Sequence, residues 1–246
     1  MKKLVAFLLS TLLLASMLGM TASAKELPFT DLPDDPVVLE AVQYVYDNGL
    51  MNGTGATTFD PGAMYTRAMF VTMLGRLDGL NGGMDPDDYT GTAFSDVPAG
   101  RWDAPYIKWA AENGIVNGVG NGRFNPQGSI TVEQYAAIMQ RYLKGAHWNI
   151  TVQVKYGNWP PAISDLSKAS SYARTPLTEM LYWGFIPSYY YSESDKTSVD
   201  VHPKDKCTRA WIASGFSGVV YAMMDPDGFE WYHNQPAYFQ GITKAD

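Results

Sequence analysis

The sequence predicts a mainly α-helical protein built from three helix-loop-helix units, with short β segments in the connectors. Three observations lead to this fold class. Short motifs recur at a constant offset, apolar residues within each copy follow helical spacing, and glycine-containing turn sequences separate the helical stretches.

The first 24 residues have the pattern of a secretory signal peptide. Lys2 and Lys3 precede an apolar run from Leu4 to Met20, and the small residues Ala22 and Ala24 frame a cleavage site. We therefore expect export and cleavage after Ala24. The run is too short and wrongly flanked for a lasting anchor, and no later stretch is long and apolar enough to span a membrane.

Composition argues against several functions. Without the leader, 16 of the 18 Lys and Arg remain against 25 Asp and Glu, so the net charge is near −9. Such an acidic chain is not expected to bind nucleic acid or an anionic membrane through its overall field. The lone Cys207 excludes an intramolecular disulfide, and the three histidines are scattered, so we interpret Cys207 as a small buried residue. No spacing of metal ligands occurs, and no metal or cofactor is expected.

A duplication organises the chain. Five motifs return 65 residues later without a gap. The pairs are Phe29-Thr-Asp31 and Phe94-Ser-Asp96, Asn48-Gly49-Leu50 and Asn113-Gly114-Ile115, Asn52-Gly53 and Asn117-Gly118, Phe59-Asp60-Pro61 and Phe124-Asn125-Pro126, and Thr66 and Thr131. Five matches in one register indicate two copies of one structural unit.

A third copy is present in diverged form. Its motifs are Ile163-Ser-Asp165, Leu181-Tyr-Trp-Gly184, Val201-His202-Pro203 and Cys207-Thr208-Arg209. The Asp and the Thr are 35 residues apart in the first two copies and 43 apart in the third. The extra residues fall in Ser188–Asp200, which we interpret as an inserted loop or hairpin. Its run Tyr189–Tyr191 is either a carbohydrate platform or a surface that packs on the tail.

Each copy begins with a helix that a glycine ends. In the first copy Val38, Val42 and Val45 follow helical spacing, and Gly49 is expected as a left-handed C-cap residue. A loop with Asn-Gly turn residues follows, and the Phe of its Phe-x-Pro motif is expected to fill the space between the two helices.

A threonine begins the second helix of each copy. Thr66, Thr131 and Thr208 can each accept a hydrogen bond from a free backbone N–H of the first turn, so we interpret them as structural caps. In the second copy Gln134 follows Thr131 at the third position, which is the arrangement of a capping box.

The connectors and the tail complete the chain. Lys144–Pro161 contains an apolar alternation from Ile150 to Tyr156, which predicts a short strand. The aromatic tail, Asp225–Asp246, is expected to fold back onto the body. The expected segments are the signal peptide 1–24, a first repeat 25–80, a second repeat with its linker 81–145, a diverged third repeat 146–224 and the tail 225–246.

In this order and spacing the motifs resemble the S-layer homology (SLH) domain family. That family shows Phe-x-Asp-Val, an Ala-rich helix ending in Asn/Asp-Gly-Ile, a Gly-x-Phe-x-Pro loop and Ile-Thr-Arg-Ala-Glu. The second copy has Phe94-Ser-Asp96-Val97, Trp109-Ala-Ala-Glu-Asn-Gly114-Ile115, Gly122-Arg-Phe124-Asn-Pro126 and Ile130-Thr131. Each motif alone is weak, but the resemblance covers nearly all of the chain after the leader, in three copies.

The resemblance implies both a fold and a function. The fold is three units in a pseudo-threefold arrangement with a central helical bundle. The function is non-catalytic binding of secondary cell-wall polysaccharide, often with pyruvate-ketal carboxylates, in grooves between units. The chain would then be a secreted protein of the bacterial cell wall or surface, with that polysaccharide, and possible other surface proteins, as its partners.

In the family the motif Arg helps to bind the sugar acid. Arg67 and Arg209 stand at this position, where a guanidinium and the free N–H groups of a helix start both favour a carboxylate. The second copy has Val132 there, followed by Glu133, so we expect at most two full anion grooves. Because that copy keeps its cap and core without the Arg, we also predict that Arg67 is not needed for folding. A surface salt bridge to an Asp is the alternative interpretation of both arginines.

Other residues complete the expected glycan site. Aspartates at the start of each copy can orient the arginines or bind sugar hydroxyls, a tryptophan offers a flat face to a sugar ring, and two glycines belong to the turn loops. These residues are Asp31, Asp96, Asp165, Trp102, Gly53 and Gly118.

Two other functions stay open from the sequence. A diverged SLH scaffold that binds another protein would account for Val132 and the altered third copy. A wall-active glycosidase with a carboxylate pair is the second alternative. It is less expected, because the repeat already accounts for the aspartates and no large catalytic segment stands beside the repeats.

Overall fold

The structure, a computed structural model, describes residues 26–80, 82–145, 148–154, 162–187, 198–224 and 237–244. Its α-helices are α2 (Pro36–Asp47), α3 (Arg67–Leu80), α4 (Ala104–Glu112), α5 (Val132–Gly145), α6 (Arg174–Tyr182) and α7 (Arg209–Met224). The short elements are η1 (Pro86–Asp88), β1 (Trp148–Val154), β2 (Ala162–Ile163), η2 (Leu166–Lys168), η3 (Ser171–Ala173), β3 (Ser198–Val199) and β4 (Ala237–Lys244). The mainly α-helical class is confirmed. The expected signal peptide and the Tyr189–Tyr191 run lie outside the described residues.

Three units of two helices make up the body: α2 and α3, α4 and α5, and α6 and α7. The first helix of each unit is followed by a glycine in the left-handed conformation, Gly49, Gly114 and Gly184, with φ of 66°, 69° and 76°. Glycine suits this place because it has no Cβ to meet the backbone. The left-handed glycine expected at the end of the first helix is therefore confirmed at Gly49, directly after the C-cap residue Asn48.

An aspartate fixes the loop between the two helices of each unit. Both carboxylate oxygens of Asp31 accept backbone N–H groups, from Phe59 at 2.8 Å and from Asp60 at 2.7 Å. The same pair of bonds joins Asp96 to Phe124 and Asn125, and Asp165 to Val201 and His202. The loops are thereby held with Phe59, Phe124 and Val201 buried in the core, as expected for the Phe positions.

The residue after the Phe position has a positive φ in every unit. The values are 60° for Asp60, 60° for Asn125 and 48° for His202. Asp, Asn and His adopt this conformation more often than other residues with a side chain. The loop sequence therefore varies between units within the limits that this backbone allows.

The second helices meet at the centre of the molecule. The ring of Phe70 in α3 lies 5.1 Å from that of Tyr135 in α5 and 6.5 Å from that of Phe216 in α7, between ring centres. Tyr135 also contacts Trp211 of α7 at 4.9 Å. Aromatic packing thus joins all three units in one core.

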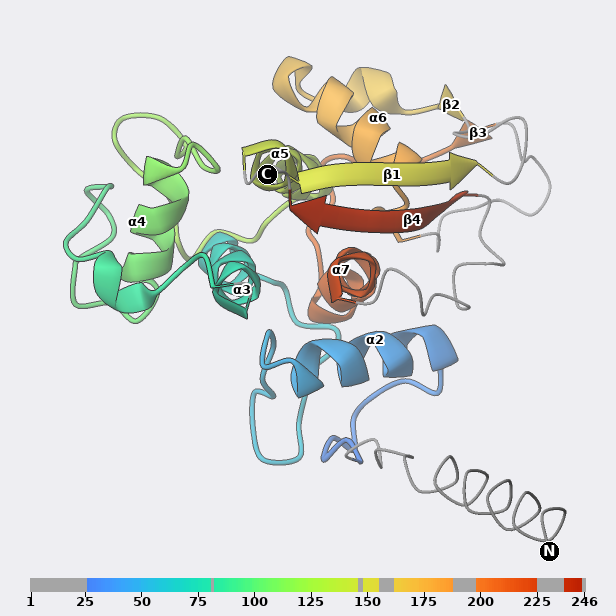
Figure 1. The fold of residues 1–246 in the computed structure, drawn as a ribbon, viewed down its shortest axis with the longest axis horizontal. Coiled ribbons are helices and arrows are strands. Elements are labelled where there is room, and N and C mark those ends of the chain that lie inside the picture. The colour runs from blue at the N-terminus through green and yellow to red at the C-terminus, as the bar shows by residue number, and fades with distance from the viewer. Residues whose placement is uncertain are drawn as a thin grey trace, which may run out of the picture.

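Each second helix also packs against the first helix of a neighbouring unit. The pairs are α3 with α4, α5 with α6, and α7 with α2, and Figure 1 shows them placed around the centre. Because the last unit returns to the first, the units form a closed ring and not an open row.

Backbone hydrogen bonds close the same ring. The N–H of Tyr65 donates to the carbonyl of Cys207, Cys207 donates to Ile130, and Ile130 donates to Tyr65, each over 2.9 Å. These three residues directly precede the threonines that begin the second helices. The pseudo-threefold arrangement that the resemblance implied is present, and Cys207 is buried as expected.

The connectors add two small sheets. β1 pairs antiparallel with β4, from Trp148 opposite Lys244 to Val154 opposite Ala237, and β2 pairs parallel with β3. The strand expected from Ile150 is confirmed as far as Val154. The tail folds back through β4, which lies against α7 as well as β1.

The threonine caps are confirmed at two of three positions. The hydroxyl of Thr66 accepts the N–H of Met69, and that of Thr208 accepts the N–H of Trp211, both at 3.2 Å. The hydroxyl of Thr131 is buried and has no hydrogen-bond partner in the described part of the chain. Only the other half of the expected capping box forms there, as Gln134 Oε1 accepts the Thr131 N–H at 3.4 Å.

Candidate functional site

Arg67, the first residue of α3, is buried in the interface with the second unit, with 5% of its surface exposed. Its Nε donates to the Phe124 carbonyl at 2.9 Å, and its Cζ lies 4.7 Å from the centre of the Phe124 ring. Removing this guanidinium would leave a carbonyl of the second unit without its partner. These contacts join two units, a role that was not expected for Arg67, and the prediction that it is not needed for folding stays a prediction.

Arg209 makes the corresponding contacts with the first unit. Its Nε donates to the Phe59 carbonyl at 2.7 Å, and its Nη2 donates to the Asn52 carbonyl at 2.6 Å. Its Cζ lies 4.4 Å from the centre of the Phe59 ring. The protein itself therefore occupies more of this guanidinium than of Arg67, whose Nη groups make no hydrogen bond with the described residues.

Among the described residues, neither arginine forms the salt bridge that was the alternative interpretation. The ion pairs of the described residues involve other cations, namely Arg101, Lys108, Arg123, Lys144 and Lys204. Both arginines instead donate to carbonyls across a unit boundary. Both side chains therefore join neighbouring units.

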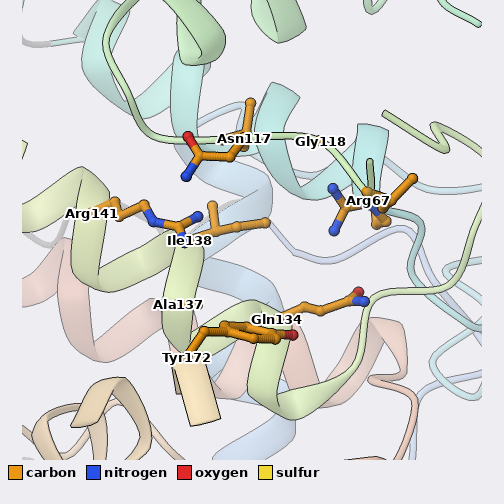
Figure 2. Close-up of a pocket in the computed structure, with 10 residues that line it drawn as sticks. Arg67, Asn117, Gly118, Gln134, Ala137, Ile138, Arg141 and Tyr172 are labelled. Atoms are coloured by element: carbon orange, nitrogen blue, oxygen red, sulfur yellow. The ribbon is translucent and has the colours of Figure 1, made fainter. Parts of the chain in front are cut away.

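A groove of about 370 Å³ opens beside Arg67, and residues of all three units line it. The lining residues are Arg67, Val116, Asn117, Gly118, Val119, Gln134, Ala137, Ile138, Arg141 and Tyr172. We call this pocket the Arg67 groove. Figure 2 shows Arg67 and Arg141 at opposite sides, with Asn117 and Tyr172 at the other two.

The groove combines two cationic side chains, which suit an anion, with amide and aromatic side chains, which suit a sugar. Arg141 of α5 and Arg67 both line the groove, and neither makes an ion pair among the described residues. Two guanidinium groups can donate several hydrogen bonds to one carboxylate. The amides of Asn117 and Gln134 offer partners for hydroxyl groups, and the ring of Tyr172 offers an aromatic surface.

The electrostatics of the groove favour a negative ligand. Burial lowers the pKa of Arg67, and the neighbouring charge of Arg141 lowers it further. Tyr172 and Asp96 act in the opposite direction and raise this pKa. The guanidinium still carries its proton at any physiological pH. An anion bound between Arg67 and Arg141 would relieve their mutual repulsion.

The structure places the expected site residues in different locations. Arg67 and Gly118 line the groove, whereas Arg209 lies in the interface between the third and first units. Asp31, Asp96 and Asp165 hold their loops, with both oxygens bonded to backbone N–H groups. Trp102 is 57% exposed and lies outside the Arg67 groove.

The two glycines of the turn loops have a packing role. A Cβ on Gly118 would lie 2.7 Å from Phe94 Cε1, and one on Gly53 would lie 2.4 Å from Phe29 Cε1. Neither position has room for a side chain while the Phe keeps its place. Both glycines therefore let an aromatic residue pack beneath the loop.

Sequence reasoning missed eight of the ten lining residues, among them the four with polar side chains, Asn117, Gln134, Arg141 and Tyr172. A signal existed for two of them. Arg141 repeats Arg76 at the offset of the duplication, and Tyr172 precedes α6 by two residues as Trp102 precedes α4. Only the packing of η3 against α5 shows that a residue of the third unit reaches this groove.

The described residues contain no cluster of three or more His, Cys, Asp or Glu side chains placed to hold a metal ion. Within the same ranges, each helix is either too short or too polar to cross a membrane.

Comparison with known proteins identifies the repeated unit. A model of the S-layer homology domain matches residues 28–68 and 93–136, which carry the loop aspartates and the helix starts of the first two units. The first and second units match the S-layer homology domain. The third unit, which shares their aspartate-bonded loop and ring contacts, lies beyond the matched residues.

Related proteins carry this kind of sequence within much longer chains. A cell surface protein of Thermoanaerobacter kivui is 33% identical over 58% of this chain and 19% of its own length. The S-layer protein sap of Bacillus anthracis is 29% identical over 63% of this chain and 18% of its own. An endoglucanase of Bacillus sp. (strain KSM-635) is 38% identical over 46% and 11%.

The SLH match and the surface-protein relatives support a wall-anchoring role at the cell surface. The matched region is less than a fifth of each of these three relatives. The similarity to the endoglucanase covers about a tenth of that enzyme.

Proposed function

We propose that the chain is a non-catalytic protein of the bacterial cell surface that binds an anionic secondary cell-wall polysaccharide in the Arg67 groove. A pyruvate-ketal carboxylate of the glycan would lie between Arg67 and Arg141. The sugar ring would pack on Tyr172, and the amides of Asn117 and Gln134 would bind its hydroxyl groups.

One observation carries the proposal: a buried arginine with unused N–H groups faces a second arginine across a groove of sugar size. The other two interfaces lack this combination. Arg209 donates to two carbonyls, and Val132 stands at the arginine position of the second unit. The Arg67 groove is therefore the proposed principal site.

The test is calorimetric titration with a pyruvylated amino sugar and with the same sugar lacking the ketal. We expect the protein to bind only the pyruvylated sugar. Arg141→Ala should weaken binding about tenfold or more, because one charge-assisted contact is lost. Arg123→Ala removes the same charge from an exposed position outside the groove and should leave the affinity unchanged.

Two results would overturn the proposal. One is equal affinity for both sugars, which would show that the carboxylate is not recognised. The other is an equal loss of affinity in Arg141→Ala and Arg123→Ala, which would reduce the effect to overall charge. Circular dichroism of each variant verifies that the fold is retained.

A further inference from the structure

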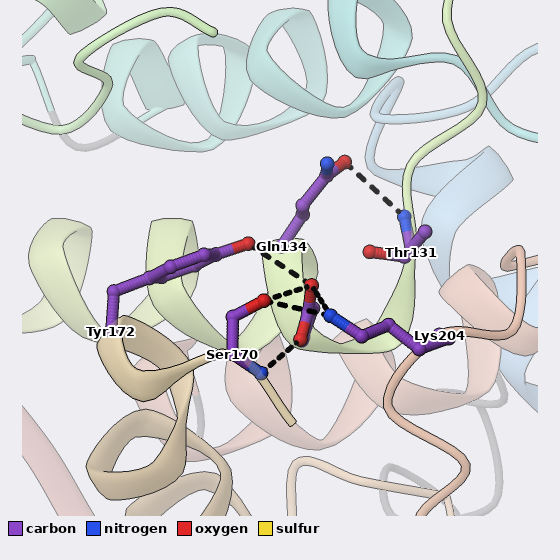
Figure 3. A network of polar contacts seen from close by, with 6 residues as sticks. Thr131, Gln134, Ser170, Tyr172 and Lys204 are labelled. Carbon is purple, nitrogen blue, oxygen red and sulfur yellow. Dashed lines mark hydrogen bonds and ion pairs between the residues drawn. The ribbon is translucent and has the colours of Figure 1, made fainter. Parts of the chain in front are cut away.

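The interface between the second and third units is built around a carboxylate. Glu133, the second residue of α5, has 5% of its surface exposed. Its Oε2 accepts the Ser170 N–H at 2.9 Å, and its Oε1 accepts the Ser170 hydroxyl at 3.1 Å. Lys204 Nζ donates to Oε1 at 2.7 Å, and the Tyr172 hydroxyl donates to the same oxygen at 3.3 Å. Figure 3 shows the side chains of Ser170, Tyr172 and Lys204 close together, with the contacts of this network as dashed lines.

This arrangement has no counterpart in the other two interfaces. The backbone N–H of Glu133 donates to the Pro203 carbonyl, as Ala68 does to Pro126 and Ala210 does to Pro61. The three backbones are therefore equivalent, but the other two positions carry only a methyl group. The Glu133 side chain is thus an addition to this one interface, next to the Val132 that replaces the arginine.

One of the Glu133 contacts, the hydrogen bond from Tyr172, connects this network to the Arg67 groove. Tyr172 lines that groove, and its hydroxyl is bonded to Glu133. Tyr172 belongs to η3 of the third unit, whereas the remaining lining residues come from the first and second units. Without a fixed hydroxyl, a tyrosine that is 49% exposed could rotate away from the groove.

The charges around this contact are compatible with an ionised Glu133. Burial alone raises its pKa, but Lys204 and the Ser170 N–H and hydroxyl lower it below the usual value. Arg67 and Arg141 face Tyr172 from the groove side and act on it electrostatically. The carboxylate is therefore a fixed acceptor at neutral pH.

We propose that Glu133 is a positioning residue for the Arg67 groove: through Tyr172 it fixes the aromatic wall on which the sugar packs. Sugar binding in a groove that is lined mainly by the first two units then depends on the third unit. This inference rests on the proposed function of the groove, and it assigns a role to a residue that does not touch the ligand.

The test compares variants at one interface. Glu133→Ala and Tyr172→Phe should each weaken binding of the pyruvylated amino sugar about fivefold to tenfold, as expected for one lost hydrogen bond that orders the site. The double variant should lose no more than either single variant, because both break the same link. Glu133→Gln keeps an oxygen acceptor and should bind within about threefold of the wild type.

The matched control is Glu179→Ala. Glu179 of α6 also joins the second and third units, by accepting from Gln140 and Lys144 of α5, but it does not line the groove. Its loss should leave sugar affinity unchanged. Equal weakening in Glu179→Ala and Glu133→Ala, or additive losses in the double variant, would show that Glu133 only stabilises the interface.

A measurement without ligand separates this inference from the proposed function. With ¹³C-labelled tyrosine, the Tyr172 Cζ resonance should shift in Glu133→Ala and stay in place in Glu179→Ala. An unchanged Tyr172 resonance in Glu133→Ala would overturn the positioning role. Absence of sugar binding by the wild type, with the resonance shifted as expected, would instead overturn the proposed function.

Discussion

Two arginines of the same groove have different relations to the fold. Arg67 is buried and bonded to the Phe124 carbonyl, whereas Arg141 makes no hydrogen bond or ion pair within the described residues. Under the proposed function, the arginine at the motif position joins two units and binds a ligand at the same time. This double role sets a limit on what a single substitution at Arg67 can show.

We predict that Arg67→Ala lowers the free energy of unfolding by about 2 kcal/mol, from the lost charge-assisted hydrogen bond and the lost cation–π contact. Arg141→Ala should change it by less than about 0.5 kcal/mol. Urea denaturation measures both. Equal stability of Arg67→Ala and the wild type would mean that the contact with Phe124 contributes nothing to folding.

The sequence indicated the arginine position but not its burial. Because the second copy has Val132 at the arginine position and retains its cap and core residues, the guanidinium was interpreted as dispensable for folding. The missing information was Glu133, whose carboxylate binds Ser170 and Lys204 across that interface. A comparison of aligned copies cannot reveal that one interface has exchanged an arginine for a different set of contacts.

At the scale of elements, the loop between the two helices of each unit depends on one carboxylate. Repetition along the sequence identified the three aspartates, yet it suggested a ligand role because polar residues at recurring positions also suit binding. The structure shows that both oxygens bind N–H groups about 28 or more residues away, which no local pattern encodes. In contrast, helix ends such as Gly49 were predictable because their signal is local.

We predict that Asp165→Asn destabilises the protein by about 2 kcal/mol, because the amide can accept from only one side and leaves a buried N–H of Val201 or His202 unpaired. Asp165 is 3% exposed, whereas Asp31 is exposed to solvent. Asp31→Asn should therefore cost less, since water can replace the lost bond.

Thermal unfolding of the two variants measures this difference. Equal losses in Asp165→Asn and Asp31→Asn would show that burial of the carboxylate does not determine its contribution. The helical content of each variant before unfolding serves as the control for an intact starting state.

At the scale of the whole molecule, the three units are expected to unfold together. Cys207 lies in the backbone ring that links Tyr65 and Ile130, and burial raises the pKa of its thiol. A thiol reagent needs the exposed thiolate, so labelling requires the ring to open. The reactivity of Cys207 therefore reports on the contact of all three units.

We predict that Cys207 is labelled slowly in native buffer and that its labelling rate rises with urea in step with the loss of helical signal. The experiment follows the reaction with an aromatic disulfide at neutral pH. Fast labelling in native buffer would mean that the third unit opens by itself. The variant Cys207→Ser is the control that no other group reacts.

The closed ring also affects how a binding site can arise in evolution. A row of three units has two interfaces, but a ring of three has three, and the last joins the third unit to the first through Arg209 and Phe59. In the Arg67 groove the arginine, the loop and the tyrosine come from three different units. No unit carries the whole of this proposed site, so moving one copy into another protein would transfer only part of it, whereas a change in one interface can act there and spare the other two interfaces.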